Sequence, residues 1–198
     1  MIVLAVVAAF AIGSVPFGYI IGRFFYHTDI RTHGSGNIGA MNALRTLGKG
    51  GAAAVLALDA AKGFLPVLLA LHAGWGPTAA ALVAAATVLG HCFSPWLGWK
   101  GGKGVATSLG ALFALAWPAA LFAMALWMVG AAVSKYSSVG SMLASVGAPL
   151  ALWYATHSAV VTGYGIFAAI LIIYAHRENL VRLREGRENS IGLFRRRQ

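Results

Sequence analysis

Long apolar runs fill most of this chain, and they restrict its fold more than any other feature. They cover roughly residues 2–22, 51–71, 78–97, 105–116, 119–133, 139–154 and 160–174. Crossing a bilayer takes about 20 apolar residues per helix. Only 10% of the 198 residues are charged, against about 25% in a soluble domain. We therefore exclude a soluble globular protein and predict an all-α integral membrane protein with about seven transmembrane helices, forming a single polytopic domain over residues 1–198.

Three of these runs differ from an ordinary membrane span, two by their length and one by its position at the amino end. Residues 105–116 and 119–133 are short for a hydrocarbon layer about 30 Å thick, so they form either two spans or one broken or re-entrant element at Trp117 and Pro118. The first run has no basic residue before it, and its nearest positive charges follow at Arg23 and Arg31. A signal peptide has the reverse order, so we expect an uncleaved span whose amino end lies outside.

The positive charges support this number of spans and indicate an orientation. Lys and Arg outnumber Asp and Glu by 15 to 5, and cytoplasmic loops collect Lys and Arg. With seven spans and the amino end outside, every basic residue except Lys62 falls in an inner segment. The carboxyl tail is then cytoplasmic, and its basic residues, Arg195 to Arg197 among them, are expected to contact anionic headgroups.

The first glycine-rich loop, residues 31–45, has the composition of an anion-binding segment. Glycines let backbone N–H groups approach an anion closely, and neutral amides, a hydroxyl and a guanidinium fork add donors. The residues concerned are Gly34, Ser35, Gly36, Asn37, Gly39, Asn42 and Arg45. The glycine spacing matches a dinucleotide fingerprint, but that fold needs a preceding strand, and here a membrane span precedes. The loop is either an anion cradle or a flexible connector.

The second glycine-rich loop, residues 98–104, reads GWKGGKG. It lacks the spacing of a nucleoside triphosphate loop. Lys103 stands between Gly101 and Gly102 on one side and Gly104 on the other, which makes a compact cationic concavity. A simple anchor at the positive side of the membrane explains the lysines but not the glycines. An anion site is therefore favoured.

Two further polar segments reach the same boundary of the membrane. One contains Ser137, Ser138 and Ser141, and the other contains His176 and Asn179, which share a helix face if the last span continues. Histidine is able to change charge near neutral pH, although an interfacial histidine with a satisfied hydrogen bond fits the spacing as well. Glu178 lies among arginines and is expected to form a structural ion pair.

Two charges fall inside the second run, at Asp59 and Lys62. Each isolated charge at the bilayer centre costs about 2.5–3.5 kcal/mol on insertion scales, so we expect the two to pair and face the bundle. They are a structural ion pair or part of a transport path. His91 and Cys92 are expected in the core, and the sequence indicates neither a metal cluster nor the polar surface of a nucleic-acid-binding protein.

The three polar clusters at the loops and helix ends meet at one face and carry donors or positive charge, which indicates an anionic ligand. Two glycine-rich cradles and Arg45 exceed what a single phosphate needs, so they favour more than one phosphate. At this point the sequence resembles the bacterial integral-membrane glycerol-3-phosphate acyltransferases that use acyl phosphate. The resemblance rests on GSGNIGAMN with Arg45, GWKGGKGVAT and HREN, in that order and at the right boundaries. This chain departs from the family at two positions. Met41 stands where the family usually has Thr, and the Pro that follows the Gly-His pair comes one position later than in the family, at Pro95.

The resemblance implies transfer of a fatty acyl group from acyl phosphate to the 1-hydroxyl of sn-glycerol 3-phosphate, giving lysophosphatidate and phosphate without a cofactor. It also implies a location in the bacterial inner membrane with the active site facing the cytoplasm, and a functional link to the enzyme that makes acyl phosphate.

The resemblance further assigns roles to residues. Ser35, Arg45, His176 and Asn179 become catalytic, and Gly34, Ser35, Gly36, Asn37, Gly39 and Asn42 would hold acyl phosphate. Arg45, Gly101, Gly102, Lys103, Gly104, Ser141, His176 and Asn179 would hold glycerol phosphate, while Asp59, Lys62 and Glu178 are structural. The alternative is a small transporter of a phosphorylated or organic anion, suggested by Asp59 and Lys62 but lacking repeated halves.

Overall fold

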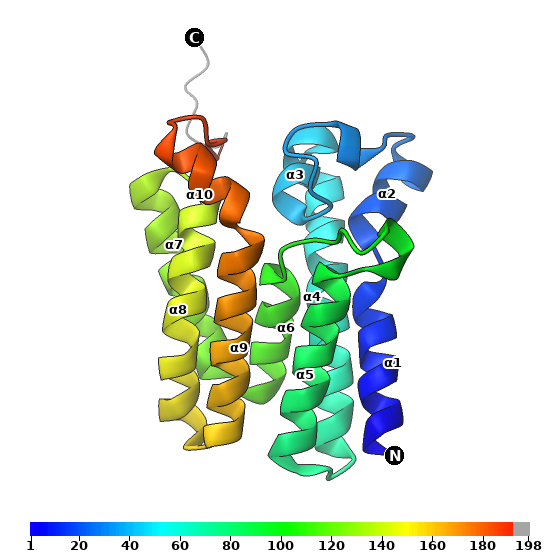
Figure 1. Ribbon diagram of the computed structural model, residues 1–198, viewed down its shortest axis with the longest axis vertical. Helices are drawn as coiled ribbons and strands as arrows, with labels where there is room; N and C mark the ends of the chain where they lie inside the picture. Colours follow the sequence, from blue (N-terminus) through cyan, green and yellow to red (C-terminus); the bar gives the residue numbers. More distant parts are fainter. Residues whose placement is uncertain (192–198) are drawn as a thin grey trace.

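Helices alone make up the regular structure of residues 1–191, the range that the computed structural model describes (Figure 1). The helices are α1 (Ile2–Ser14), α2 (Phe17–Phe25), α3 (Ala40–Thr46), α4 (Gly48–His72), α5 (Gly76–Cys92), α6 (Val105–Leu115), α7 (Trp117–Ser134), α8 (Ser137–Thr156), α9 (Ala159–Ala175) and α10 (Arg177–Arg184), with short 3-10 turns η1 (Ile30–Thr32) and η2 (Pro95–Leu97). Arg195 to Arg197, expected to contact headgroups, lie outside the described residues.

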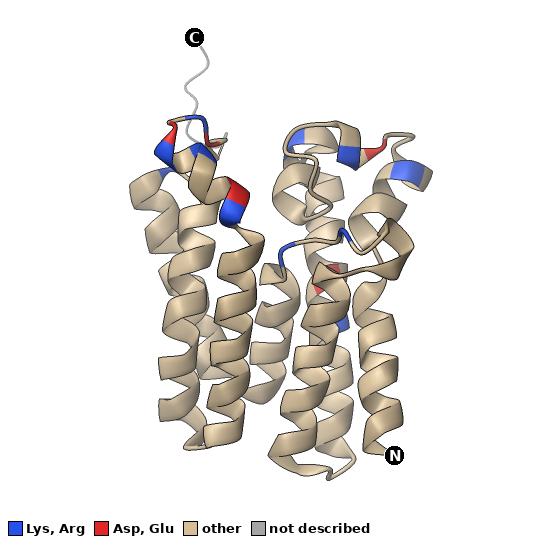
Figure 2. Ribbon diagram, in the orientation of Figure 1, with Lys and Arg blue, Asp and Glu red and all other residues tan. Residues whose placement is uncertain are grey.

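The apolar helices run side by side, and the polar segments collect at one end of the bundle (Figure 1). We call this the polar end; it carries α2, α3, α10 and both glycine-rich loops. Charged residues gather there as well (Figure 2), whereas Asp59 and Lys62 lie within α4. The sequence prediction that the loops with chemistry share one face is thus confirmed, while the side of the membrane that they face stays a prediction.

All seven predicted runs fold as helices, which confirms the all-α membrane architecture. Five stretches are long and apolar enough to cross a membrane, and they are Ile2–Phe25, Gly48–His72, Gly76–Leu97, Trp117–Ser134 and Ser137–Thr156. A sixth consists of α9 and α10 together, with a bend of 52° between them. The remaining apolar helix, α6, has 11 residues and reaches only about half of a layer 30 Å thick.

The structure decides the question left open at residues 105–133. Ala116 separates α6 from α7, and Pro118 occupies the first turn of α7, a position where its missing N–H costs nothing. In Figure 1, α6 leads away from the polar end and α7 returns to it. The two runs are therefore separate helices that together form a short hairpin.

Small residues bring the helices close together. A Cβ atom at Gly63 of α4 would lie 2.0 Å from the Thr107 carbonyl oxygen of α6, and one at Gly110 would lie 1.9 Å from the Ala60 carbonyl oxygen of α4. Side chains would hold these backbones apart, and close approach is how helices gain dispersion energy in lipid. Gly130 and Gly140 give α7 and α8 a similar contact. The helices are thus closely packed beneath the polar end.

A second apolar core lies at the polar end itself. Its buried members come from α2, η1, the first glycine-rich loop, α3 and the start of α4, and they are Ile21, Ile30, Ile38, Ala43, Leu47 and Val55. Burial of this many branched side chains gives the surrounding loop a defined conformation. The first glycine-rich loop is therefore part of a packed unit, which argues against a flexible connector.

Candidate functional site

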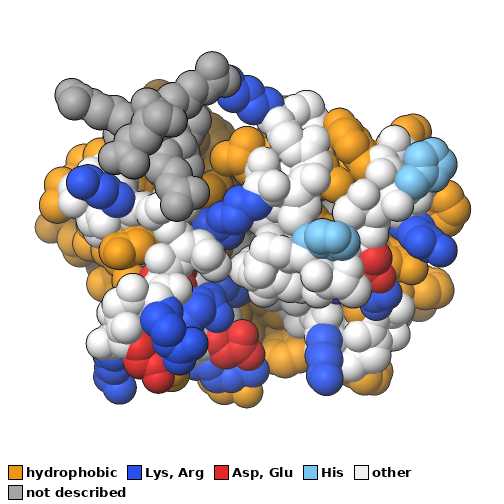
Figure 3. All heavy atoms as spheres, turned by 90° about the horizontal axis from the view of Figure 1, so that it is seen from above, with side chains coloured by type: hydrophobic (Ala, Val, Ile, Leu, Met, Phe, Trp, Pro, Cys, Tyr) orange, Lys and Arg blue, Asp and Glu red, His pale blue; other side chains and the backbone are white. Residues whose placement is uncertain are grey.

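A cavity of about 380 Å³ opens among the helices at the polar end. Its polar wall contains Ser35, Asn37, Asn42, Arg45, Lys103, Ser137, Ser138, Ser141, His176, Asn179, Arg182, Glu188 and Asn189. Its apolar wall, formed by α4, α6 and α7, contains Leu56, Leu109, Leu112, Ala123, Met124, Trp127 and Met128. Figure 3 looks onto this end, where basic side chains are spread over the face and apolar ones lie toward its edge. The cavity thus joins a cationic mouth to an apolar trough.

Asn42 organises the first glycine-rich loop from within. Its side chain is buried, and its amide oxygen accepts a 2.8 Å hydrogen bond from the Ser35 backbone N–H. Its amide nitrogen donates to the carbonyl oxygens of Ile30, His33 and Asn37 at 2.9, 3.0 and 2.9 Å. Since all of its N–H groups point to backbone carbonyls, the structure revises the predicted role of Asn42: it holds the loop instead of donating to an anion.

The glycines of this loop divide into two kinds. Gly34 and Gly36 have φ of 61° and 69°, which a residue with a side chain rarely adopts, and neither lines the cavity. A Cβ atom at Gly34 would also lie 2.2 Å from Asn42 Oδ1. Ser35, Asn37 and Gly39 do line the cavity. In this structure Gly34 and Gly36 bend the loop and present Ser35, and their predicted contact with an anion stays a prediction.

Ser35 is the hydroxyl that the loop directs at the cavity. It is only partly buried, and within residues 1–191 the hydrogen-bond network of the protein leaves its Oγ without a partner. Arg45 stands at the mouth, where its guanidinium donates to the Asn189 carbonyl oxygen at 3.3 Å. One hydroxyl and one guanidinium therefore stay available to a ligand on this side.

The second glycine-rich loop uses its glycines for packing. The backbone N–H groups of Gly101 and Gly102 donate to the carbonyl oxygens of Cys92 and His91 at 3.0 and 2.9 Å. A Cβ atom at Gly102 would lie 2.1 Å from His91 Nε2. The N–H groups of Gly101 and Gly102 are thus engaged and neither residue lines the cavity, so their contact with a phosphate stays a prediction that this geometry does not favour.

Lys103 is the residue that this loop delivers to the cavity. Gly104, with φ of 81°, turns the chain directly into α6, so that the first turn of α6 at Val105 and Ala106 also lines the cavity. Burial, and next the charge of Arg182, lower the pKa of Lys103 to about 8. Gly104 shapes this turn and, like Gly101 and Gly102, does not itself line the cavity.

A hydrogen-bonded chain connects Lys103 to the carboxyl tail. Its ammonium donates to Asn179 Oδ1, and Asn179 Nδ2 donates to Glu188 Oε1 at 2.5 Å. Glu188 also accepts from Ser138 Oγ at 2.9 Å and from Arg182 Nε at 2.8 Å. Its side chain is only 4% exposed. One carboxylate therefore fixes the orientation of three donors that face the cavity.

Glu178 forms the expected ion pair with Arg182, and the buried Glu188 forms a shorter one with the same arginine. The Glu178 side chain is 73% exposed and reaches Arg182 only at 3.9 Å, so its contribution to stability is small. Arg182, Glu188 and Asn189 were missed because the tail was read as a lipid-facing segment. Two residues in the sequence of this tail indicate a turn back toward the bundle, namely Gly186 and the apolar Ile191. In the structure Gly186 has φ of 66° and turns the chain, and Ile191 is buried and donates its N–H to the Lys135 carbonyl oxygen at 2.9 Å.

His176 lies just beyond the end of α9, where the helix direction changes. It is buried, and its Nδ1 is 2.8 Å from the Ile172 carbonyl oxygen, a contact that places the proton on Nδ1 and leaves Nε2 as an acceptor. An imidazole with an open Nε2 therefore faces the cavity beside Asn179, even though the two residues do not share a continuous helix.

Ser141 and the intramembrane charges complete the site. Ser141 lines the cavity and its hydroxyl donates to the Ser137 carbonyl oxygen at 2.9 Å. The predicted ion pair is present, with Lys62 Nζ 2.7 Å from Asp59 Oδ1 and both side chains 2% exposed. Asp59 and His91 border the cavity as well. Predicted residues from three separate segments, among them Ser35, Lys103 and His176, thus surround one space.

Comparison with known proteins agrees with this geometry. The family model for glycerol-3-phosphate acyltransferase matches residues 3–186. A glycerol-3-phosphate acyltransferase of Synechococcus sp. (strain JA-2-3B'a(2-13)) is 46% identical over 191 residues, covering 96% of this chain and 94% of the relative. One from Methylorubrum extorquens (strain PA1) is 48% identical over 193 residues, covering 97% and 94%.

Solved structures give the same result. A crystal structure of PlsY (YgiH), an integral membrane glycerol 3-phosphate acyltransferase, in its glycerol 3-phosphate form, has a TM-score of 0.92 at 39% identity, covering 98% of this chain and 99% of that one. Its lysophosphatidic acid form has a TM-score of 0.90 at 38% identity, with the same coverage. The chain therefore belongs to the glycerol-3-phosphate acyltransferase family, as an integral membrane acyltransferase of the PlsY type.

Proposed function

We propose that this protein transfers a fatty acyl group from acyl phosphate to the 1-hydroxyl of sn-glycerol 3-phosphate, which yields lysophosphatidate and inorganic phosphate. The observation that carries the proposal is the single cavity in which a cationic, donor-rich mouth continues into an apolar trough. A substrate with a phosphate head and a long acyl chain fits both parts. A small soluble dianion needs only the mouth.

The donor side is the first glycine-rich loop together with the trough. Ser35, Asn37 and Gly39 would hold the phosphate of acyl phosphate, and the acyl chain would lie along Leu109, Met124 and their neighbours. Leu56 and Met128 line the trough and are 47% and 54% exposed on the outside of the bundle. A chain entering from the bilayer would pass between these two residues without leaving an apolar environment.

The acceptor site lies between the two loops. Lys103 from the second loop and Arg45 from the end of the first supply positive charge, and Asn179, Ser141 and His176 supply neutral polar groups around the same space. The relatives are named for glycerol 3-phosphate, and one similar structure is of a glycerol 3-phosphate form, which supports this substrate.

The reaction needs positioning more than activation, since acyl phosphate is already a reactive mixed anhydride. The 1-hydroxyl oxygen attacks the acyl carbon, the bond from that carbon to the phosphate oxygen breaks, and the hydroxyl proton passes to the departing phosphate or to Nε2 of His176. Lys103 and Arg45 offset the repulsion of two anions and the charge that develops. We propose direct transfer with Ser35 as a hydrogen-bonding group, and an acyl group trapped on Ser35 during turnover would contradict it.

We place the polar end at the cytoplasmic face of a bacterial inner membrane, where glycerol phosphate is soluble and an enzyme that makes acyl phosphate supplies the donor. The distribution of Lys and Arg supports this orientation. Cysteine residues introduced at the His72 and Lys49 ends of α4, after replacing buried Cys92 with alanine, would label from opposite sides of sealed cells. Labelling of the Lys49 end from outside would contradict the orientation.

The function is tested with purified protein, an acyl phosphate and glycerol 3-phosphate. We expect release of phosphate and formation of lysophosphatidate in equal amounts, with acyl-coenzyme A unable to replace the donor. Folded protein that releases no phosphate, but moves a phosphorylated anion across sealed vesicles, would support the transporter and overturn the acyltransferase.

A further inference from the structure

The break in the first span is held by side chains from two other parts of the chain. Val15 and Pro16 separate α1 from α2, and Pro16 offers no N–H to continue the helix. Lys62 Nζ donates to the Val15 carbonyl oxygen at 2.8 Å. Ser94 Oγ donates to the Ser14 carbonyl oxygen at 2.6 Å. In hydrocarbon each of these carbonyls needs a partner. The Val15 carbonyl also accepts from the Phe17 N–H at 3.1 Å, and the side-chain donors come from α4 and from the segment before the second glycine-rich loop.

On one side the break leads directly to the first glycine-rich loop. A Cβ atom at Gly18 in α2 would lie 1.8 Å from the Ile38 carbonyl oxygen, so α2 and the loop touch backbone to backbone. Ile38 is buried, and the next residue, Gly39, lines the cavity. A change in the angle at Pro16 would therefore shift the wall that carries Ser35.

On the other side the break leads to the second loop by two routes. Trp96 Nε1 donates to Ser14 Oγ at 2.9 Å, which adds to the bond from Ser94. The second route runs through Lys62 and Asp59 to His91, whose Nδ1 lies 3.7 Å from Asp59 Oδ1, a packing contact and not a hydrogen bond.

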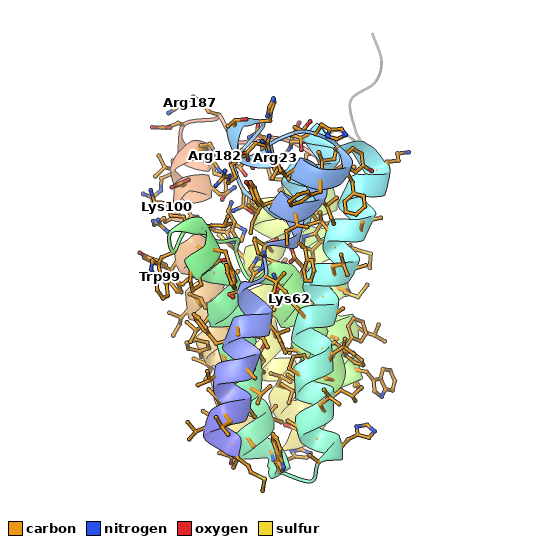
Figure 4. The ribbon with its side chains drawn as sticks, turned by 90° about the vertical axis from the view of Figure 1, so that its right-hand side faces the viewer. Arg23, Lys62, Trp99, Lys100, Arg182 and Arg187 are labelled. Carbon is orange, nitrogen blue, oxygen red and sulfur yellow. The ribbon has the colours of Figure 1, made fainter. Side chains whose placement is uncertain are left out.

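His91 carries the second route into the loop itself, because its backbone carbonyl and its ring both contact Gly102. Figure 4 shows Lys62 deep among the helices, well below Arg23, Arg182 and Arg187 at the polar end. The Asp59–Lys62 pair thus lies between the break at Val15, which leads to the first loop, and His91, which contacts the second.

We infer that Asp59, Lys62 and Ser94 are positioning residues that fix the first glycine-rich loop relative to the second through the break at Val15 and Pro16. A pair that served helix packing alone would join two helices by their side chains. Here the lysine binds a backbone carbonyl at a break, and the carboxylate lies between that lysine and the histidine that contacts Gly102. This inference rests on the proposed function, in which the two loops hold the two reacting anions, and an error of about 1 Å in their separation costs roughly 100-fold in rate.

The test compares Ser94→Ala and the double variant D59N/K62M with wild type, in steady-state kinetics with acyl phosphate and glycerol 3-phosphate. The double variant removes both charges together, so that no unpaired charge stays buried. We expect kcat to fall at least tenfold in each, while the KM for each substrate changes less than threefold, because each loop still binds its own anion. Thr156→Ala is the matched control, since its hydroxyl donates to the Leu152 carbonyl oxygen at 2.7 Å on α8, far from the polar end.

The melting temperature is measured for all variants alongside the kinetics. A loss of melting temperature with unchanged kcat in Ser94→Ala would overturn the inference, because it is what a purely structural bond produces. If the double variant does not fold, Ser94→Ala alone decides. Wild-type protein that is inactive with acyl phosphate would refute the proposed function instead, which keeps the two failures apart.

Discussion

The two glycine-rich loops look alike in sequence but use their glycines in opposite ways. In the first loop, Gly34 and Gly36 adopt positive φ and wrap the backbone around Asn42. In the second, Gly101 and Gly102 bring the backbone against the end of α5, and their N–H groups are bound there. The first loop therefore offers a curved wall with several contacts to the cavity, whereas the second delivers Lys103 and the first turn of α6. Glycine content alone does not distinguish a cradle from a packing surface.

The largest loss of activity is expected for a substitution at Gly102, which tests the packing role of the glycines in the second loop most directly. In Gly102→Ala the new Cβ would meet His91 Nε2 at 2.1 Å, so the loop must move and Lys103 with it. We expect kcat/KM to fall about 100-fold or more, equivalent to at least 2.7 kcal/mol.

Gly163→Ala is the control for Gly102→Ala. A Cβ atom there has open space around it, and alanine favours a helix interior, so we expect unchanged activity. A Gly102→Ala enzyme with wild-type kinetics would show that the second loop tolerates a side chain and that its glycines do not pack as described.

Lys103 comes next, because it is the charge that the second loop carries into the cavity. Removing a charged hydrogen-bond donor costs about 1.5–3 kcal/mol, so Lys103→Met should raise the KM for glycerol 3-phosphate at least tenfold. An unchanged KM would remove Lys103 from the acceptor site.

The pH dependence gives Lys103 a second test. Its pKa is lowered to about 8, and the ammonium form exists below that pKa. Therefore kcat/KM for glycerol 3-phosphate should decline as the pH rises through about 8. In Lys103→Arg the decline should move to higher pH, since a guanidinium stays protonated. A decline at the same pH in this variant would assign it to another group.

Much of this comparison lay beyond the sequence, for a physical reason. The spans and the Asp59–Lys62 pair follow from local patterns, namely apolar length and the cost of a charge in lipid, and both were predicted. Whether the N–H of Gly101 is free depends on Cys92, and the role of Glu188 depends on Ser138, 50 residues earlier. Such contacts arise only when helices pack. The residue types in the sequence therefore indicated where the site lies, but they did not distinguish residues that face the cavity from residues that hold the loops in place.

A smaller effect is expected at Asn42, which sharpens the description of the first loop. Asn42→Ala leaves buried backbone groups without partners, at about 1–3 kcal/mol, so the free energy of unfolding should fall by that amount and kcat about tenfold. Asn37→Ala removes a single hydrogen bond, from the Gly39 N–H at 2.9 Å, and should cost less stability. If denaturation shows Asn37→Ala to be the more damaging change, Asn42 does not organise the loop.

The smallest effect is expected at Glu188, which supports the Lys103 side from the tail. Glu188→Gln keeps the shape but weakens the charged bonds to Arg182 and Asn179, worth about 1 kcal/mol. Hydrogen bonds from Asn179, Arg182 and Ser138 outweigh the effect of burial and lower the pKa of Glu188, so the carboxylate is ionised throughout the neutral range. We expect a threefold to tenfold rise in the KM for glycerol 3-phosphate and little change in the KM for acyl phosphate, because only the second loop touches this network.

Glu178→Gln is the matched control on the same helix, since that side chain is exposed, and its kinetics should match wild type. Equal rises in both KM values of Glu188→Gln would mean that the tail holds both loops, through the contact of Arg45 with Asn189, and that the division of labour between the loops is less complete than their backbones indicate.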